Sequence, residues 1–126
     1  MNRHQVTAVC CGGIIGAVTR WGLIEILPTF THWPWHILLI NVSGSAALGL
    51  LVGLLIESPN NLLSLAAGTG FCGAFTTFSS FTVEIATAIK AREYFNSISF
   101  LVASILGGLL AYQIGKRAMK SGKARI

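Results

Sequence analysis

The residues best suited to chemistry lie in one stretch of an apolar segment, from Gly68 to Glu84 (GTGFCGAFTTFSSFTVE). Glycine costs about 1 kcal/mol against alanine in a helix interior, and threonine costs somewhat less. We therefore expect the helix to break between Gly73 and Thr77, which exposes carbonyls of one half-helix and amides of the other. Freed carbonyls are good ligands for a hard cation such as Na⁺. The stretch predicts a backbone used for ion binding, which a plain membrane anchor does not need.

The second half of the same stretch carries side chains that can face an anion. Phe78 and Phe81 are three residues apart, so they project from one side of a helix, with Ser79 and Ser80 between them. A phenyl ring has a positive edge. Such an edge can face an anion without holding it as tightly as a lysine would. Ordinary aromatic packing explains the same spacing, and both interpretations are open at this point.

Polar residues elsewhere in the chain are candidates to act with this stretch. Asn41 lies in an apolar run where its amide needs a partner, so it either joins two helices or donates to a passing anion. Arg20 either anchors a helix at the interface beside Trp21 or places a positive charge in a water-filled mouth. Ser97 and Ser104 are seven residues apart and lie near one helix face.

The elements that position these residues must be membrane helices. Of the 126 residues, 53% are hydrophobic and 10% are charged, whereas about 25% are charged in soluble domains. Apolar runs of about 20 residues span a bilayer, and four of them fit, at about 6–27, 35–56, 62–89 and 95–115. We predict an all-α membrane protein with one four-helix transmembrane domain over residues 1–126. Its third helix is broken in mid-membrane, and residues 116–126 form a basic tail.

Small residues predict how these helices pack. Gly12 and Gly16 form a GxxxG pair in the first span, and Gly49 and Gly53 form another in the second. This spacing lets helix backbones approach closely in lipid.

Charge and cysteine content exclude several classes of function. Five of the nine cations lie in the tail, so the net charge of +5 indicates contact with anionic lipid rather than nucleic acid. The three cysteines give no disulfide framework or metal-ligand spacing. No nucleophile and base form a pair, so catalysis is not expected.

The same cations bear on orientation. Six of them lie on the side of the two termini and two, Lys90 and Arg92, on the other, which favours cytoplasmic termini. Near the helix ends the count is only three against two, a bias weak enough to permit insertion in both orientations.

The stretch GFCGAFTTFSSF (residues 70–81), followed by Glu84, resembles the signature of the Fluc (CrcB) family of fluoride channels. GGIIGAVTRW (residues 12–21) and INVSGSAALG (residues 40–49) resemble the family's first- and second-helix patterns, in order. The similarity covers nearly the whole chain. It implies a passive fluoride channel that lets cells shed toxic fluoride, in a bacterial inner membrane. It also implies a dual-topology antiparallel homodimer with two pores.

The resemblance implies a role for each candidate residue. The fluoride pore would be formed by Phe78, Phe81, Asn41, Ser79, Ser80, Ser104 and Thr77, with Arg20 in the vestibule. The backbone carbonyls of Gly73 and Thr76 would hold a structural Na⁺, which is not transported, at the dimer centre. The chain departs from the family in Phe100, where many members have a tyrosine hydroxyl, and in Ser80, where many have threonine.

Two other functions are compatible with four membrane spans. A proton-coupled exporter of the small multidrug resistance type needs a carboxylate deep in the first span, but Glu25 lies near its end and Arg20 is the deeper charge. A structural or accessory subunit would not need a broken third helix.

Overall fold

The computed structural model describes residues 1–27, 33–55 and 61–123, with the side chains of 120–123 excepted. This part of the chain is all-helical, and its elements in order are α1 (Arg3–Ile26), α2 (Trp35–Leu55), α3 (Leu62–Ser64), η1 (Leu65–Cys72), α4 (Gly73–Phe75), α5 (Phe78–Lys90) and α6 (Tyr94–Lys123). The elements from α3 to α5 form a single bent third helix. The four helices so defined are long and apolar enough to cross a membrane, which confirms the predicted all-α class with four spans.

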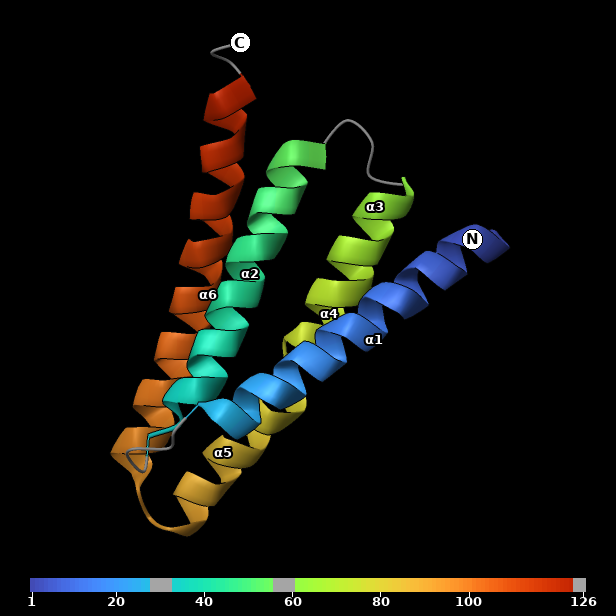
Figure 1. Cartoon of the computed structure of the whole chain (residues 1–126). Helices are drawn as coiled ribbons and strands as arrows, with labels where there is room; N and C mark the ends of the chain where they lie inside the picture. Colours follow the sequence, from blue (N-terminus) through green and yellow to red (C-terminus); the bar gives the residue numbers. More distant parts are fainter. Residues whose placement is uncertain (28–32, 56–60, 124–126) are drawn as a thin grey trace.

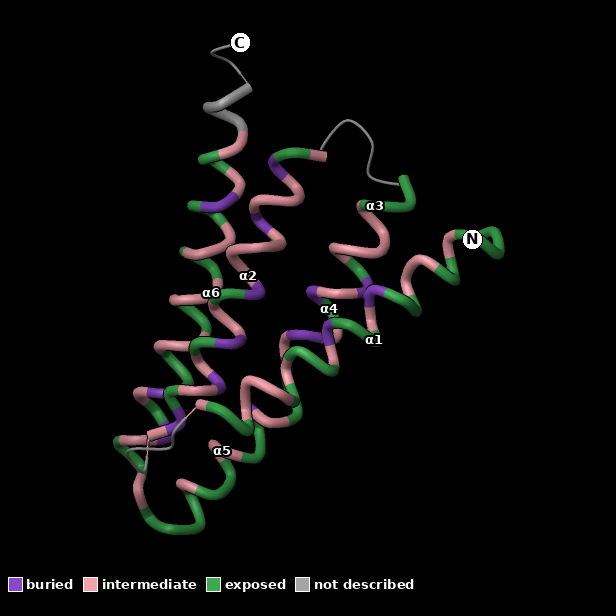
Figure 2. Tube along the Cα trace, in the orientation of Figure 1, coloured by how far each residue is buried: buried purple, intermediate pink, exposed green. Residues whose placement is uncertain are grey.

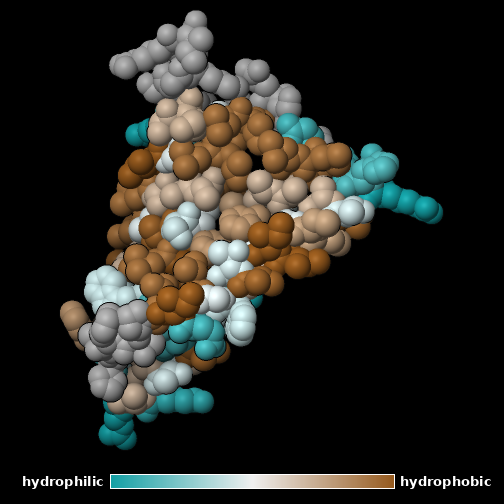
Figure 3. Space-filling view, in the orientation of Figure 1, coloured by the Kyte–Doolittle hydropathy of each residue, from teal (hydrophilic) through white to brown (hydrophobic). Residues whose placement is uncertain are grey.

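The helices form two closely packed pairs (Figure 1). Helix α2 packs along α6, and α1 crosses over η1 and α4. The first turn of α1, the end of α2 and the end of α6 lie toward one end of the molecule, and the turn from α5 to α6 lies at the other. Hydrophobic residues cover the middle of the face seen in Figure 3, and hydrophilic residues gather at its extremities. This distribution is typical of a protein that spans a bilayer.

Both terminal helices extend beyond their predicted spans. Helix α1 begins at Arg3 because Asn2 and Gln5 form a capping box: Asn2 Oδ1 accepts from the Gln5 amide at 2.9 Å, and Gln5 Oε1 accepts from the Asn2 amide at 3.0 Å. Helix α6 has 30 residues, about 45 Å at 1.5 Å per residue. That length exceeds the hydrocarbon core of about 30 Å. Helix α6 therefore extends past the membrane core and includes the basic tail up to Lys123. Residues 124–126 lie outside the described residues.

The glycine pairs do bring backbones together. A Cβ on Gly12 would press on the carbonyl of Ala66, and one on Gly16 would press on that of Phe71. The glycine pair of α2 meets α6 in the same way. Buried residues accordingly mark the crossing of α1 over the third helix and the side of α2 (Figure 2). The prediction of close packing at these pairs is confirmed.

The first half of the third helix has a geometry that the sequence did not predict. Residues Leu65–Cys72 form a π-helix of 8 residues, whereas π-geometry is usual only as a single-turn bulge. Within it, Gly70 touches α1, since a Cβ there would meet the carbonyl of Val9 and the amide of Gly13. The absence of a side chain at Gly70 lets the backbone of the π-helix lie directly against the backbone of α1.

Candidate functional site

The third helix is interrupted within the predicted region. Helix α4 ends at Phe75 and α5 begins at Phe78. Thr76 and Thr77 between them are extended, with φ and ψ of −73° and 155° at Thr76 and −138° and 120° at Thr77. These two residues leave the helical conformation, so the backbone groups on either side of them lose helical hydrogen bonds and need other partners.

Asn41 of α2 supplies two of these partners. Its Nδ2 donates to the Thr77 carbonyl at 3.0 Å, and its Oδ1 accepts from the Thr77 amide at 2.8 Å. Thr77 is 5% exposed, so these bonds satisfy buried backbone groups. The side-chain amide nitrogen carries two hydrogens, and within the described part of the chain Asn41 Nδ2 makes only the bond to Thr77, which leaves its second N–H for another acceptor. Both functions expected of Asn41 are therefore compatible with its geometry.

Two carbonyls at the break lose their helical amide partners. In an unbroken helix the Thr77 amide would donate to Gly73 O, and the Ser80 amide would donate to Thr76 O. Instead the Thr77 amide donates to Asn41, and the Ser80 amide donates to Thr77 Oγ1 at 3.1 Å. Gly73 is exposed on the single chain, with nothing within 4 Å of a Cβ built there.

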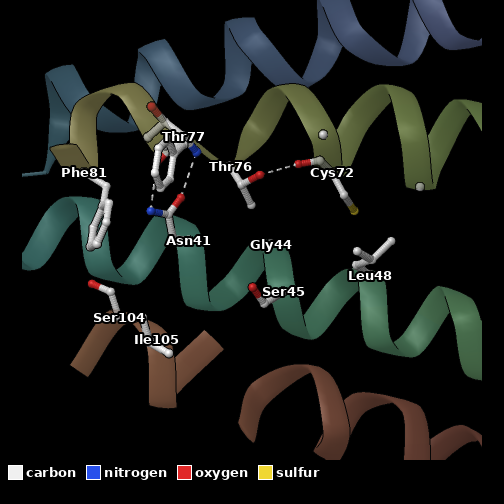
Figure 4. Close-up of a pocket in the computed structure, with 13 residues that line it drawn as sticks. Asn41, Gly44, Ser45, Leu48, Cys72, Thr76, Thr77, Phe81, Ser104 and Ile105 are labelled. Carbon is white, nitrogen blue, oxygen red and sulfur yellow. Dashed lines mark hydrogen bonds between the residues drawn. The ribbon is translucent and has the colours of Figure 1, made fainter. Parts of the chain in front are cut away.

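A cavity of about 380 Å³ opens beside the break (Figure 4). Among the described residues that line it, none carries a formal charge. They come from α2, η1, α4, α5 and α6, and comprise Asn41, Gly44, Ser45, Leu48, Gly68, Cys72, Gly73, Thr76, Thr77, Phe78, Phe81, Ser104 and Ile105. The structure thus brings most of the predicted site residues to a single wall.

The two phenylalanines of α5 lie together on this wall. Their ring centroids are 5.7 Å apart, with the planes tilted by 36°. Phe81 is 9% exposed, and Phe78 is 77% exposed on the single chain. Phe81 also belongs to a buried cluster with Ile37 and Phe100. Its position is therefore fixed by packing, whereas Phe78 is held only from one side.

Ser104 of α6 has a buried hydroxyl that is not paired within the described part of the chain. Its Oγ has no hydrogen-bond partner there, and Figure 4 shows the hydroxyl turned toward the Phe81 ring. An unpaired buried hydroxyl is uncommon because it costs about 1–3 kcal/mol. This donor belongs to a residue that lines the same cavity as Asn41.

Three predicted residues do not line the cavity. Ser79 is exposed, with its Oγ 3.2 Å from Thr77 Oγ1, and Ser80 Oγ accepts from Thr77 Oγ1 at 3.0 Å. The guanidinium of Arg20 instead reaches the break from α1, where Nη1 donates to the Thr76 carbonyl at 3.3 Å. These side chains surround Thr76 and Thr77 rather than the cavity.

Sequence reasoning missed part of the wall. Ser45 lies four residues after Asn41, and this spacing places both on one face of α2. Cys72 lies four residues before Thr76, is 2% exposed and accepts the Thr76 hydroxyl at its carbonyl, at 3.0 Å. The helical spacing from Asn41 and from Thr76 was the signal that could have identified both.

Comparison with known proteins places the chain among channels. Residues 7–116 match the profile of the family described as CrcB-like protein, Camphor Resistance (CrcB). The fluoride-specific ion channel FluC 2 of Moorella thermoacetica is 42% identical over 109 residues, which cover 85% of this chain and 89% of the relative. FluC of Dehalococcoides mccartyi (strain BAV1) is 37% identical over 115 residues, 88% of each chain. FluC of Thermococcus onnurineus is 37% identical over 109 residues, 84% of this chain and 88% of the relative.

Proposed function

Because the chain belongs to the CrcB family of multi-pass membrane proteins, we propose that it is a passive channel selective for fluoride. In this proposal fluoride leaves the cytoplasm down its gradient, so the protein limits fluoride toxicity. The carboxylate of Glu25, which a proton-coupled exporter would use, lies exposed in the last turn of α1. That position does not favour the exporter.

The observation that carries the proposal is an uncharged cavity with unsatisfied donors. The Ser104 hydroxyl has no partner among the described residues, and Asn41 keeps one N–H after bonding Thr77. Fluoride is small and strongly hydrated, so a pore must replace its water with donors of this kind. The ring edges of Phe78 and Phe81 add positive potential. A wall without fixed cations would let the ion leave again.

We further propose an antiparallel, dual-topology homodimer with two pores and a structural Na⁺ between the copies. The residues fit the ion, because the carbonyls of Gly73 and Thr76 have lost their helical amides. Arg20 occupies one acceptor site on Thr76 O, and a carbonyl oxygen has a second lone pair. When bound, Na⁺ would supply positive charge that holds carbonyls of both copies together. Arg20 would draw anions toward the vestibule.

Fluoride efflux from liposomes tests the function. Purified protein is reconstituted with internal KF, and an external fluoride electrode records efflux after valinomycin releases the K⁺ gradient. We expect rapid fluoride efflux without a proton gradient and far slower chloride efflux under the same conditions. Absence of fluoride efflux, or chloride efflux at the same rate, would refute the proposal.

Substitution of the two phenylalanines tests the pore assignment. Phe78→Ile and Phe81→Ile keep apolar bulk but remove the ring edge, so each should slow fluoride efflux at least tenfold, about 1.4 kcal/mol in barrier. Phe95→Ile is the matched control, because Phe95 is 84% exposed and does not line the cavity. If both pore variants conducted like Phe95→Ile, the pore would lie elsewhere even in a fluoride channel.

A further inference from the structure

Trp33 contacts α2 and α6 and does not line the cavity. A tryptophan next to the end of a membrane helix is typical of the lipid interface. In the structure its Nε1 donates to Ser99 Oγ of α6 at 2.9 Å. Its ring meets Phe100 edge-on, with centroids 5.4 Å apart and planes at 85°. The Trp35 ring also packs on the Trp33 ring, with centroids 4.3 Å apart. The indole is thus tied to α6 by a hydrogen bond and by ring packing.

Phe100 transmits this contact to the pore wall. It is 1% exposed and lies 5.4 Å from Phe81, centroid to centroid, at 44°. Trp33 packs against the buried cluster of Ile37, Phe81 and Phe100. All three cluster members are apolar, so nothing but packing orients the Phe81 ring from this side.

Ser99 is prepared to accept the indole N–H. Its hydroxyl donates to the Asn96 carbonyl at 3.0 Å. That bond uses its only hydrogen and turns the oxygen lone pairs toward another donor. The serine and the indole are therefore each held in a single orientation.

We propose that Trp33 is a positioning residue for conduction, which acts through Phe100 to set the angle at which Phe81 presents its ring to the cavity. The proposal rests on the proposed function, in which Phe81 faces the permeating anion. The angle matters because an aromatic ring is positive at its edge and negative at its face. A rotation of the Phe81 ring would replace an attractive surface with a repulsive one, without any change in pore width.

The experiment uses full-length protein in liposomes at a density below one channel per vesicle. The fraction of trapped fluoride released reports how many channels are folded, and the rate of release from active vesicles reports conduction by each channel. The variants are Trp33→Phe, which keeps a ring but loses the N–H, Ser99→Ala, which loses the acceptor, and the double variant. Trp21→Phe is the matched control, because Trp21 is 66% exposed on α1 and lies outside the cluster.

We expect Trp33→Phe and Ser99→Ala each to slow release from active vesicles by about two- to tenfold, the range that one net hydrogen bond gives. The released fraction should stay constant, and Trp21→Phe should behave like the wild type. The double variant should be no slower than the slower single variant, because both remove the same bond.

Three results would overturn the inference. In the first, the Trp33→Phe and Ser99→Ala variants release fluoride at the same rate as Trp21→Phe. In the second, they release a smaller fraction of the fluoride at an unchanged rate. In the third, the double variant is slowed by the product of the two single factors. Phe81→Ile separates this failure from that of the proposed function. If the wild type conducts and Phe81→Ile is slow while the Trp33 and Ser99 variants are normal, only the role of Trp33 is wrong. If Phe81→Ile conducts normally, the pore assignment fails, and this inference with it.

Discussion

Replacing Ser104 with alanine should make the protein more stable and the channel slower. A substitution that raises stability and lowers activity indicates a side chain that serves binding at a cost to folding. Ser104 fits this case because its buried Oγ has no partner among the described residues and lines the cavity that holds Phe81 and Asn41.

The magnitudes follow from the two environments of the hydroxyl. An unsatisfied buried polar group costs about 1–3 kcal/mol, so the free energy of unfolding should rise by up to that amount. A hydrogen bond to a charged partner contributes about 1.5–3 kcal/mol. Loss of such a bond to fluoride would lower occupancy of this position, and efflux below saturation, by about 10- to 150-fold.

Two measurements on the same preparation test this prediction. Thermal unfolding in detergent gives the stability, and fluoride efflux from liposomes gives the conduction. Ser43→Ala is the matched control, since Ser43 is exposed on α2 and its hydroxyl donates to the Ile40 carbonyl of its own helix at 3.0 Å. A Ser104→Ala protein that unfolds earlier and conducts normally would show that the hydroxyl has a structural partner and no contact with the ion.

Other substitutions separate packing within the chain from binding. Gly16→Ala should lower the unfolding temperature by several degrees, because its Cβ would press on a carbonyl of η1, whereas Gly22→Ala, with open space around it, should not. Asn41→Asp should abolish most fluoride efflux, because it sets a carboxylate oxygen against the Thr77 carbonyl and a negative charge beside the anion path. Gly73→Ala should not harm the single chain, since φ is −64° and a Cβ meets nothing within 4 Å. Loss of the dimer in this variant would therefore locate its effect at a second copy, and protein prepared without Na⁺ should show the same loss of the dimer.

The sequence predicted the helices well because membrane helices are set by local composition. Long apolar runs must be helical in lipid, where every backbone group needs an internal partner. Glycines at GxxxG spacing predicted close approach of backbones at the first and second spans, but not which helices would meet. The start of α1 was missed by three residues, although the polar pair Asn2 and Gln5 has the capping-box spacing.

The site was predicted less completely, because its contacts join residues far apart in the chain. The sequence indicated a break between Gly73 and Thr77, but not that Asn41 would bond both backbone groups of Thr77. Nor could composition distinguish Trp33, which packs on the buried cluster of Ile37, Phe81 and Phe100, from an aromatic at the lipid interface. Propensity is a local property, whereas partner choice depends on how helices are placed in three dimensions.

The break itself explains why cation and anion chemistry would occur side by side. An interrupted helix in a membrane persists only if its freed polar groups find partners. Asn41 satisfies both backbone groups of Thr77, and the Thr77 hydroxyl accepts the Ser80 amide. Most of the freed donors are thus paired within the chain, whereas the carbonyls of Gly73 and Thr76 keep acceptor capacity. Acceptors left over at the break favour a cation there.

The same partner choice also leaves hydrogen-bond donors available at this site. Asn41 bonds Thr77 through one of its two N–H groups, and it lines the same cavity as Ser104, whose hydroxyl has no partner among the described residues. Donors left over favour an anion, and the edge of Phe81 adds to that preference. Because Asn41 pairs both backbone groups of Thr77, the break is left with acceptor capacity on Gly73 and Thr76 and with free donors on Asn41 and Ser104. On this reasoning, a variant that restores a continuous helix at Thr76 and Thr77 would lose both ions together.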